Sequence, residues 1–223
     1  ARYWMVRGLL REANDFDMFA RQMNSDIETE LRISISAIFA MDKVTQLLKQ
    51  LKEAFPKTII HLDIETASGE RMLLDEMVDI GIYAGLEQDA RVQYRRIDRC
   101  ILPIFISQHF PLADKPDINQ SDLISYPQVV VKSSYKTSPD SGIVKDGLQW
   151  YVSDHHTKKA LIRSGLGWGR LPVHEVEQEI GQNQLIRLEI QNEMDIPVYV
   201  ARLKSKTLGP VGMAVWNFFD DYI

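Results

Sequence analysis

The chain has 223 residues, of which 45% are hydrophobic and 26% charged, and its formal net charge is −5 with a pI near 5.6. This composition excludes a disordered or fibrous protein, and the negative charge argues against a broad surface that grips nucleic-acid phosphates. Cys100 is the only cysteine and no run reaches the ~18 apolar residues of a membrane span, so we expect a cytoplasmic protein without an internal disulfide.

Residues 1–30 are expected to form a long amphipathic helix. Apolar side chains recur at alternating intervals of three and four residues, which is typical of a coiled-coil seam. The seam consists of Val6, Leu9, Ala13, Phe16, Ala20, Met23 and Ile27. We expect a dimerising or linker helix, and a terminal helix packed on its own domain is the alternative. No capping residue precedes Ala1, which favours a polypeptide that continues upstream.

The next segment, residues 31–103, is predicted to be an α/β lobe. Strands are predicted over 31–36, 58–64 and 78–83, with helices over 42–54 and 69–77 between them. Successive β-α units with nearly continuous apolar strands indicate a parallel sheet, whose ligands bind beyond the carboxyl ends of the strands. These ends carry Ser36, Ala37 and Ile38, then Thr66, Ala67 and Ser68, then Tyr83 and Gly85. Capping of the following helices by the hydroxyl groups is an equally weighted alternative to ligand contact.

A second lobe is predicted over residues 104–203, after two extended segments within 91–106 and a crossing at Pro103. Its strands are expected at 129–131, 148–152, 185–188 and 196–203, with helices over 155–163 and from Pro172 to Ile180. The last of these strands could return the chain toward the first lobe, and residues 211–222 are expected to form a closing helix. The predicted domains are therefore 1–30 as the linker, 31–103 with 204–223 as lobe I, and 104–203 as lobe II.

Three alternate glycines, Gly165, Gly167 and Gly169, mark the segment from Leu161 to Pro172. Glycine can take positive φ and can approach a neighbouring strand or a ligand closely. We interpret this segment as one wall of a cleft, although such a pattern more often forms a plain loop.

No motif in the sequence predicts catalysis or metal binding. A Gly-x-Ser-x-Gly elbow is absent and the five histidines are scattered, without cysteine or carboxylate partners at ligand spacing. We therefore expect neither an enzyme nor a protein with a metal or cofactor.

The order of the motifs resembles the effector-binding region of LysR-type transcriptional regulators, and the resemblance spans nearly the whole chain. Gly8-Leu-Leu-Arg-Glu-Ala is similar to the start of the family's linker helix, and Leu31-Arg-Ile-Ser-Ile-Ser to its first receptor strand. Phe55-Pro, Val78-Asp-Ile-Gly-Ile, Phe110-Pro-Leu-Ala and Gly165-Leu-Gly-Trp-Gly-Arg-Leu-Pro are similar to four further motifs. The fold implied is α/β, with two Rossmann-like lobes and a cleft between them, like type 2 periplasmic binding proteins.

The resemblance also implies a function. The chain would sense a small-molecule effector, form a homodimer or tetramer, and reach DNA only through an upstream domain that it lacks. Lobe closure would change how the linker helices are held. The alternative is a two-lobed solute-binding protein of a transporter.

Carried over to this sequence, the resemblance implies an effector site between the lobes. Together with the strand ends above, the candidate residues are Ser36, Ala37, Ile38, Phe39, Thr66, Ser68 and Tyr83 from the first lobe and Val131, Ser133 and Trp168 from the second. Ile38 stands where many members have a Ser or Thr that holds an inducer carboxylate, which argues against a small carboxylic acid. Trp168 replaces a smaller aliphatic residue and predicts a flat, aromatic ligand stacked on the indole.

Overall fold

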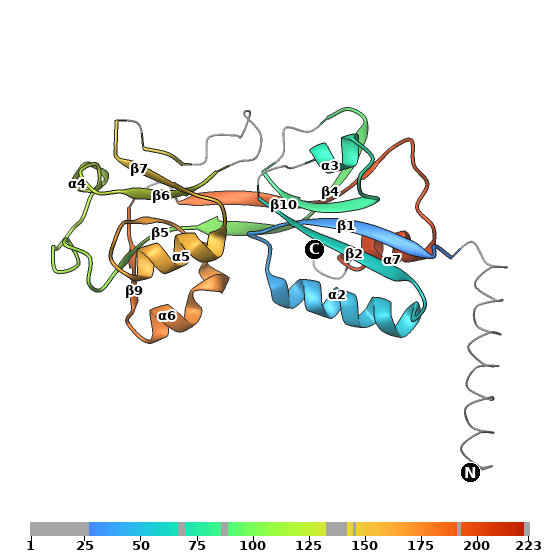
Figure 1. Ribbon diagram of the computed structural model, residues 1–223, viewed down its shortest axis with the longest axis horizontal. Coiled ribbons are helices and arrows are strands. Elements are labelled where there is room, and N and C mark those ends of the chain that lie inside the picture. The colour runs from blue at the N-terminus through green and yellow to red at the C-terminus, as the bar shows by residue number, and fades with distance from the viewer. Residues whose placement is uncertain are drawn as a thin grey trace, which may run out of the picture.

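The computed structural model describes residues 27–66, 70–85, 89–132, 142–144, 146–190 and 193–220. Their helices and strands form two lobes connected by long strands (Figure 1). Most of the expected helix over 1–30 lies outside the described residues, and its last four positions, 27–30, are not helical, because the first strand already begins at Glu30. Of the predicted seam only Ile27 is described, and its side chain packs against the core of the first lobe. None of the described helices has the length and apolar character needed to span a membrane.

The first lobe is built on a five-stranded sheet in the order β2-β1-β3-β10-β4. β1 (Glu30–Ser36), β2 (Ile59–Glu65) and β3 (Ile80–Ala84) are parallel, whereas β10 (Met194–Leu203) and β4 (Val92–Leu102) are antiparallel partners. α2 (Met41–Ala54) and α7 (Pro210–Asn217) share one hydrophobic core with β1, and α3 (Arg71–Leu74) packs in a separate cluster with β4 and β10. α2 buries Val44, Leu47 and Leu51, whose spacing of three and four residues places them on one helix face.

The sheet pairing places β10 in the first lobe and not in the second. It pairs along its length with β4, from Met194 opposite Leu102 to Leu203 opposite Val92. The boundary expected at residue 203 is therefore wrong, because the chain has already returned to the first sheet at Met194. Periodicity predicted the strand, but its partner lies far away in the sequence, and periodicity does not encode such a pairing.

The second lobe contains two small sheets that touch. β5 (Ile104–Ser107) pairs antiparallel with β8 (Gly169–Arg170) and β9 (Leu185–Leu188), and β6 (Gln128–Val131) pairs parallel with β7 (Gln149–Val152). An isolated parallel bridge between Gln128 and Trp168 joins the two sheets. Its helices are α4 (Gln120–Leu123), α5 (His155–Arg163), the 3-10 turn η1 (Val173–Glu175) and α6 (Glu177–Gly181).

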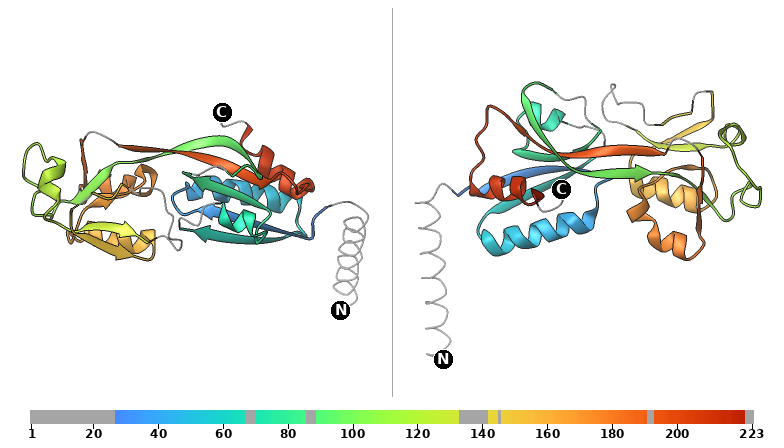
Figure 2. Two further views of the ribbon diagram at one scale, coloured as in Figure 1. Left: turned by 90° about the horizontal axis from the view of Figure 1, so that it is seen from above. Right: turned by 180° about the vertical axis from the view of Figure 1, so that it is seen from behind.

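The crossover between the lobes runs through two adjacent strands. β4 passes directly into β5 through Pro103, whose carbonyl accepts a hydrogen bond from the backbone N–H of Leu171. In Figure 2, β4 and β10 run side by side from the first lobe toward the second. A change in the angle between the lobes would therefore bend the chain near Pro103 and before Met194.

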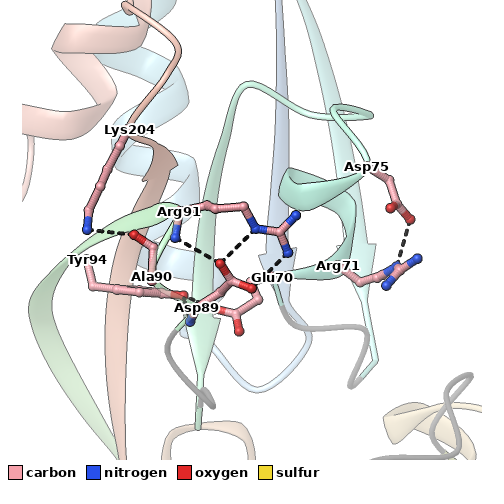
Figure 3. A network of polar contacts seen from close by, with 8 residues as sticks. All are labelled: Glu70, Arg71, Asp75, Asp89, Ala90, Arg91, Tyr94 and Lys204. Carbon is pink, nitrogen blue, oxygen red and sulfur yellow. Dashed lines mark hydrogen bonds and ion pairs between the residues drawn. The ribbon is translucent and has the colours of Figure 1, made fainter.

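A polar network holds the segment just before β4 next to α3 in the first lobe (Figure 3). The Tyr94 hydroxyl donates to the Glu70 carboxylate and accepts from the backbone N–H of Asp89 at 2.7 Å. Arg91 donates to both carboxylate oxygens of Asp89, at 2.9 and 2.8 Å, and this lowers the pKa of Asp89 to about 2. The network therefore ties the residue before α3 to the start of β4, the end of that strand opposite to Leu102.

Candidate functional site

The direction of the strands decides which edges of the two lobes face each other. In the first lobe the parallel strands β1, β2 and β3 end at Ser36, Glu65 and Ala84. The backbone N–H of Gly85, just beyond β3, donates to the carbonyl of Pro197. From Pro197, β10 continues past the end of β3 to Met194 at the crossover. The carboxyl ends of the parallel strands are therefore directed toward the second lobe.

The second lobe presents a corresponding edge. Arg170 at the end of β8 pairs with Ile104, which directly follows Pro103 of the crossover. β6 and β7 run parallel to this segment, so Val131 and Val152 end at the same edge, and α5 begins there at His155. Strand ends and a helix N-terminus thus face the first lobe, which is the usual place for a ligand in such sheets.

The predicted turn after β1 lies on this facing edge of the first lobe. Ser36 is buried, its carbonyl accepts from the N–H of Phe39 at 2.9 Å, and the N–H of Ala37 donates to the carbonyl of Glu65 at 2.9 Å. The side chain of Phe39 lies in the core, edge-on to Phe219 with ring centroids 6.0 Å apart, and Ile38 packs against the same core. The turn therefore places Ser36 and Ala37 at the facing edge, while Ile38 and Phe39 support it from the core.

Thr66 directly follows β2 and Val131 ends β6, so both are at the facing edges and both are partly buried. Ser68 and Ser133 lie outside the described residues. Whether these side chains touch a ligand stays a prediction.

Tyr83 is a core residue and does not reach the facing edge. Its side chain is fully buried in a cluster with Leu73 and Val92, and its hydroxyl shares a hydrogen bond with that of Ser34. The ring covers Gly81 so closely that a Cβ atom there would overlap it. Burial raises the pKa of the phenol. The expected ligand contact is wrong because the side chain points into the sheet's own core.

Trp168 is also a core residue, with an exposed fraction of 1%. Its indole N–H donates to the carbonyls of Leu123 at 3.0 Å and Tyr126 at 3.1 Å, and the ring packs with Phe110. No face of the ring is open to a ligand. The prediction of an aromatic effector stacked on Trp168 is therefore wrong.

The alternate glycines serve close packing against β6 instead of forming a cleft wall. A Cβ atom at Gly167 would lie 2.5 Å from the carbonyl oxygen of Pro127, and one at Gly169 would lie 3.0 Å from that of Val129. Of the three, only Gly165 has a positive φ, 77°, where the chain turns beneath His109. Removing the Cβ atoms lets the Trp168 segment bridge to β6.

Two cations that the sequence reasoning missed, Lys158 and Arg170, lie at the facing edge of the second lobe. The Cε atom of Lys158 is 3.2 Å from the Cβ position of Gly169, the neighbour of Arg170. Burial, with a smaller contribution from Arg170, lowers the pKa of Lys158 to about 8. Burial also lowers the pKa of Arg170, whose Nη1 donates to the carbonyl of Leu102 at 2.9 Å.

His155, one turn before Lys158, adds a third nitrogen centre. Its Nδ1 atom is buried and has no hydrogen-bond partner among the described residues. Burial, then the charge of Lys158, lowers the pKa of the imidazole to about 4, so the ring is neutral near pH 7. Asp154 caps the helix here, accepting from the N–H of Thr157 at 2.7 Å.

A sequence signal for Lys158 did exist. It falls three residues after His155 and four before Ile162, which is fully buried, so all three share one face of the helix predicted over 155–163. A lysine on the apolar face of a helix signals a cation held in the protein interior.

The 3-10 turn η1 lies close enough to the first lobe for charged groups of that lobe to act on its histidine. The pKa of His174 is lowered by burial and also responds to Asp98 and Lys43, which form an ion pair of 2.6 Å in the first lobe. Burial raises the pKa of the neighbouring Glu175, with Lys159 and Lys158 opposing the shift. The region around Lys158 therefore lies at the junction of the two lobes.

Within the described ranges, no group of three or more His, Cys, Asp or Glu residues could hold a metal ion. A pocket of about 350 Å³ is lined by Gln108, His109, Arg163 and Gln184. Because β5 and α5 end at this pocket, it lies at the edge of the second lobe opposite to the crossover.

Comparisons with known proteins agree with this geometry. The model of a family described as LysR substrate binding domain matches residues 24–222. The HTH-type transcriptional regulator AceR of Acinetobacter baumannii is 28% identical over 175 residues, covering 76% of this chain. The chain spans only 58% of the length of AceR.

Solved structures show the same fold at low sequence identity. The regulatory domain of the LysR family regulator MetR from N. meningitidis matches with a TM-score of 0.68 and 15% identity, covering 86% of this chain and 90% of that one. The CcmR regulatory domain of Synechocystis in complex with 2-PG gives 0.68 and 18%, covering 86% and 97%. A full-length OxyR variant from Pseudomonas aeruginosa gives 0.68 and 17%, covering 97% of this chain and 77% of that one.

Proposed function

Since the chain belongs to the LysR substrate-binding domain family, we propose that it is the effector-sensing and oligomerisation region of a LysR-type transcriptional regulator. The observation that carries the proposal is that the family model matches residues 24–222. The fold agrees with it, because the strand ends of two lobes face each other across the crossover. The matched relatives are regulators, which favours this function over solute delivery to a transporter. DNA would be contacted by a part of the regulator outside this chain, and the regulator would act in the cytoplasm.

An effector would act by fixing the angle between the lobes. Ser36, Ala37 and Thr66 would meet it from the first lobe, and the ends of β6 and β8 from the second. A ligand that binds both edges favours the lobe orientation in which both can be reached, and this shifts the population toward that state. The bend would occur at Pro103 and before Met194, where β4 and β10 connect the lobes.

We further propose a homodimer or tetramer, which exposed apolar side chains on two edge strands support. Ile59 and Ile64 on β2, at the edge of the first sheet, are 60% and 47% exposed. Trp150 and Tyr151 on β7, at the edge of the second lobe's parallel pair, are 41% and 53% exposed. Unpaired strand edges with apolar side chains are typical association surfaces.

The proposal is tested by a thermal-shift screen of small metabolites combined with light-scattering mass measurement. A compound that binds only the folded chain raises its melting temperature by mass action. We expect at least one such compound and a mass of two or four chains at micromolar concentration. A chain that stays monomeric at high concentration would contradict the oligomer, and binding that protects neither facing edge would contradict the sensor.

A further inference from the structure

Lys158 on α5 lies in an unusual environment for a lysine. Its aliphatic stem lies against Gly169, and side chains of a helix point back toward its N-terminus, which here is the facing edge of the second lobe. Its side chain is partly buried, yet among the described residues its ammonium group has neither a hydrogen bond nor an ion pair. A buried cation without a counter-ion costs stability and calls for an explanation.

The adjacent lysine on the same helix, Lys159, does have an anionic partner. Lys159 pairs with Glu179 at 2.8 Å and donates to the carbonyl of Glu175 at 2.9 Å. Lys158 forms no such pair among the described residues, although Glu175 is near enough to influence its pKa. The burial that raises the pKa of Glu175 weakens it as a compensating anion.

Other groups at this edge add to the positive potential. Arg170 follows Gly169, and Lys132 is exposed just beyond β6, where its N–H donates to the carbonyl of Val152 at 2.8 Å. His155, at the first turn of α5, is neutral near pH 7 and adds no charge, but its buried Nδ1 lacks a partner within the part of the chain that the structure describes. Asp154 is committed to capping that helix.

We propose that Lys158 and Arg170, with the first turn of α5, bind the acidic group of the effector, a carboxylate or a phosphate. The inference rests on the proposed function and names the chemical class of its ligand. Lys158 supplies the compact charge, and Arg170 supplies directed N–H donors suited to an oxyanion. The turn after β1 and Thr66 in the first lobe would then hold the rest of the ligand.

The position of Arg170 connects this site to the crossover. Its Nη1 bonds to the carbonyl of Leu102, the last residue of β4, and Leu102 pairs with Met194, the first residue of β10. An anion that draws the Arg170 side chain toward Lys158 therefore acts on a contact at the point where both connecting strands leave the first lobe. This gives the bound acidic group a direct route to the angle between the lobes.

The test uses the 223-residue chain and three probes, sodium sulfate, inorganic phosphate and succinate, against sodium chloride at matched ionic strength. Melting temperature and isothermal titration are measured for the parent, for Lys158→Met and for the charge-preserving Lys158→Arg. Lys159→Met is the matched control, because it removes the same charge from the adjacent residue, which is already paired. Circular dichroism shows that each variant folds, and Lys158→Gln replaces Lys158→Met should the latter not fold.

We expect at least one probe to raise the melting temperature of the parent and of Lys159→Met by several degrees. In Lys158→Met the apparent dissociation constant should be about tenfold higher or more, and Lys158→Arg should restore much of the binding. The three probes also distinguish the two kinds of acidic group. Binding of succinate indicates a site for a carboxylate, and binding of phosphate or sulfate indicates a site for a tetrahedral anion. Equal responses of the parent and Lys158→Met would overturn the proposal.

If none of the three anions bound to the parent or raised its melting temperature, the proposal that the effector carries an acidic group would also be overturned. The proposed function would survive that result if a neutral or cationic metabolite from the wider screen stabilised the chain.

Discussion

The carboxylate of Glu28 caps the N-terminus of α7 by accepting from Val211, although the two residues are 183 positions apart. Its oxygens accept from the backbone N–H groups of Val211 at 2.9 Å and Gly212 at 3.0 Å. Gly209 leaves room for it, since a Cβ atom there would lie 2.5 Å from the Glu28 carboxyl carbon. The same segment is held from the other side, because Thr58 donates to the carbonyl of Glu28. The chain entering the first lobe is thus fixed to both α7 and the start of β2.

Replacing Glu28 by Ala should lower the free energy of unfolding by about 1–2 kcal/mol, because two N–H groups at a helix N-terminus lose their acceptor. Urea denaturation at pH 7 measures the loss. Glu53→Ala is the control, since Glu53 is exposed near the end of α2. A loss no larger than that of the control would show that water replaces the cap without cost.

Trp168→Ala should destabilise the chain by about 3–5 kcal/mol, the cost of emptying a fully packed aromatic site. Trp168→Phe should cost less but still leave the carbonyls of Leu123 and Tyr126 without their donor. Denaturant unfolding of both variants checks the order. A Trp168→Ala chain of normal stability that had lost only ligand affinity would contradict the core assignment.

Removing the charge of Lys158 should stabilise the ligand-free chain. At pH 7, Lys158→Met should raise the free energy of unfolding by about 1–3 kcal/mol, because the folded state no longer holds an uncompensated cation. The folded pKa, about 8, is below the ordinary value of 10.5, so the unfolded chain binds more protons between these values. The parent should therefore gain stability relative to Lys158→Met as pH rises from about 8 to 10.5, and a constant difference over that range would contradict this.

Acidification should weaken the fold through His155. Its pKa is lowered from 6.5 to about 4, so the unfolded state binds more protons in this window and stability is lost as pH falls through it. His174, whose pKa is also lowered, acts in the same direction. His155→Gln should reduce the change in unfolding free energy between pH 6.5 and 4 by up to about 1–3 kcal/mol. If the unfolding free energy of the variant and of the parent fell equally with pH, a group other than His155 would be responsible for the loss.

A charge on the edge of β2 should weaken self-association. Ile59→Glu should shift the light-scattering mass toward a monomer, because it places a carboxylate on an exposed apolar strand edge. Met77→Glu is the matched control, since Met77 is 57% exposed but lies outside the strands. A mass lowered equally by both variants, or by neither, would rule out β2 as the association surface.

Features with local causes were predictable from the sequence. The bounds of α5, 155–163, agree with the expectation, because a capping Asp and an apolar periodicity lie within the segment itself. The helix expected over 69–77 is only one turn, 71–74, and Glu76 takes a left-handed φ of 54° where the chain turns toward β3.

Features that depend on distant neighbours were not predictable. The partner of β10 and the burial of Trp168 are set by residues that lie far away in the sequence. Trp168 resembles a ligand-stacking residue in a glycine-rich segment until Leu123 and Tyr126 are placed at its indole nitrogen. Lys158 could have been identified from its helix face, but the surroundings that leave it without a counter-ion among the described residues could not.

The most direct test of the central claim is hydrogen–deuterium exchange of the chain with and without a compound that raises its melting temperature. We predict that binding slows exchange at both facing edges together, in residues 36–40 after β1 and in the first turns of α5. Protection confined to one lobe, or to the segments around Gln108 and Gln184 at the opposite edge, would contradict an effector site between the lobes.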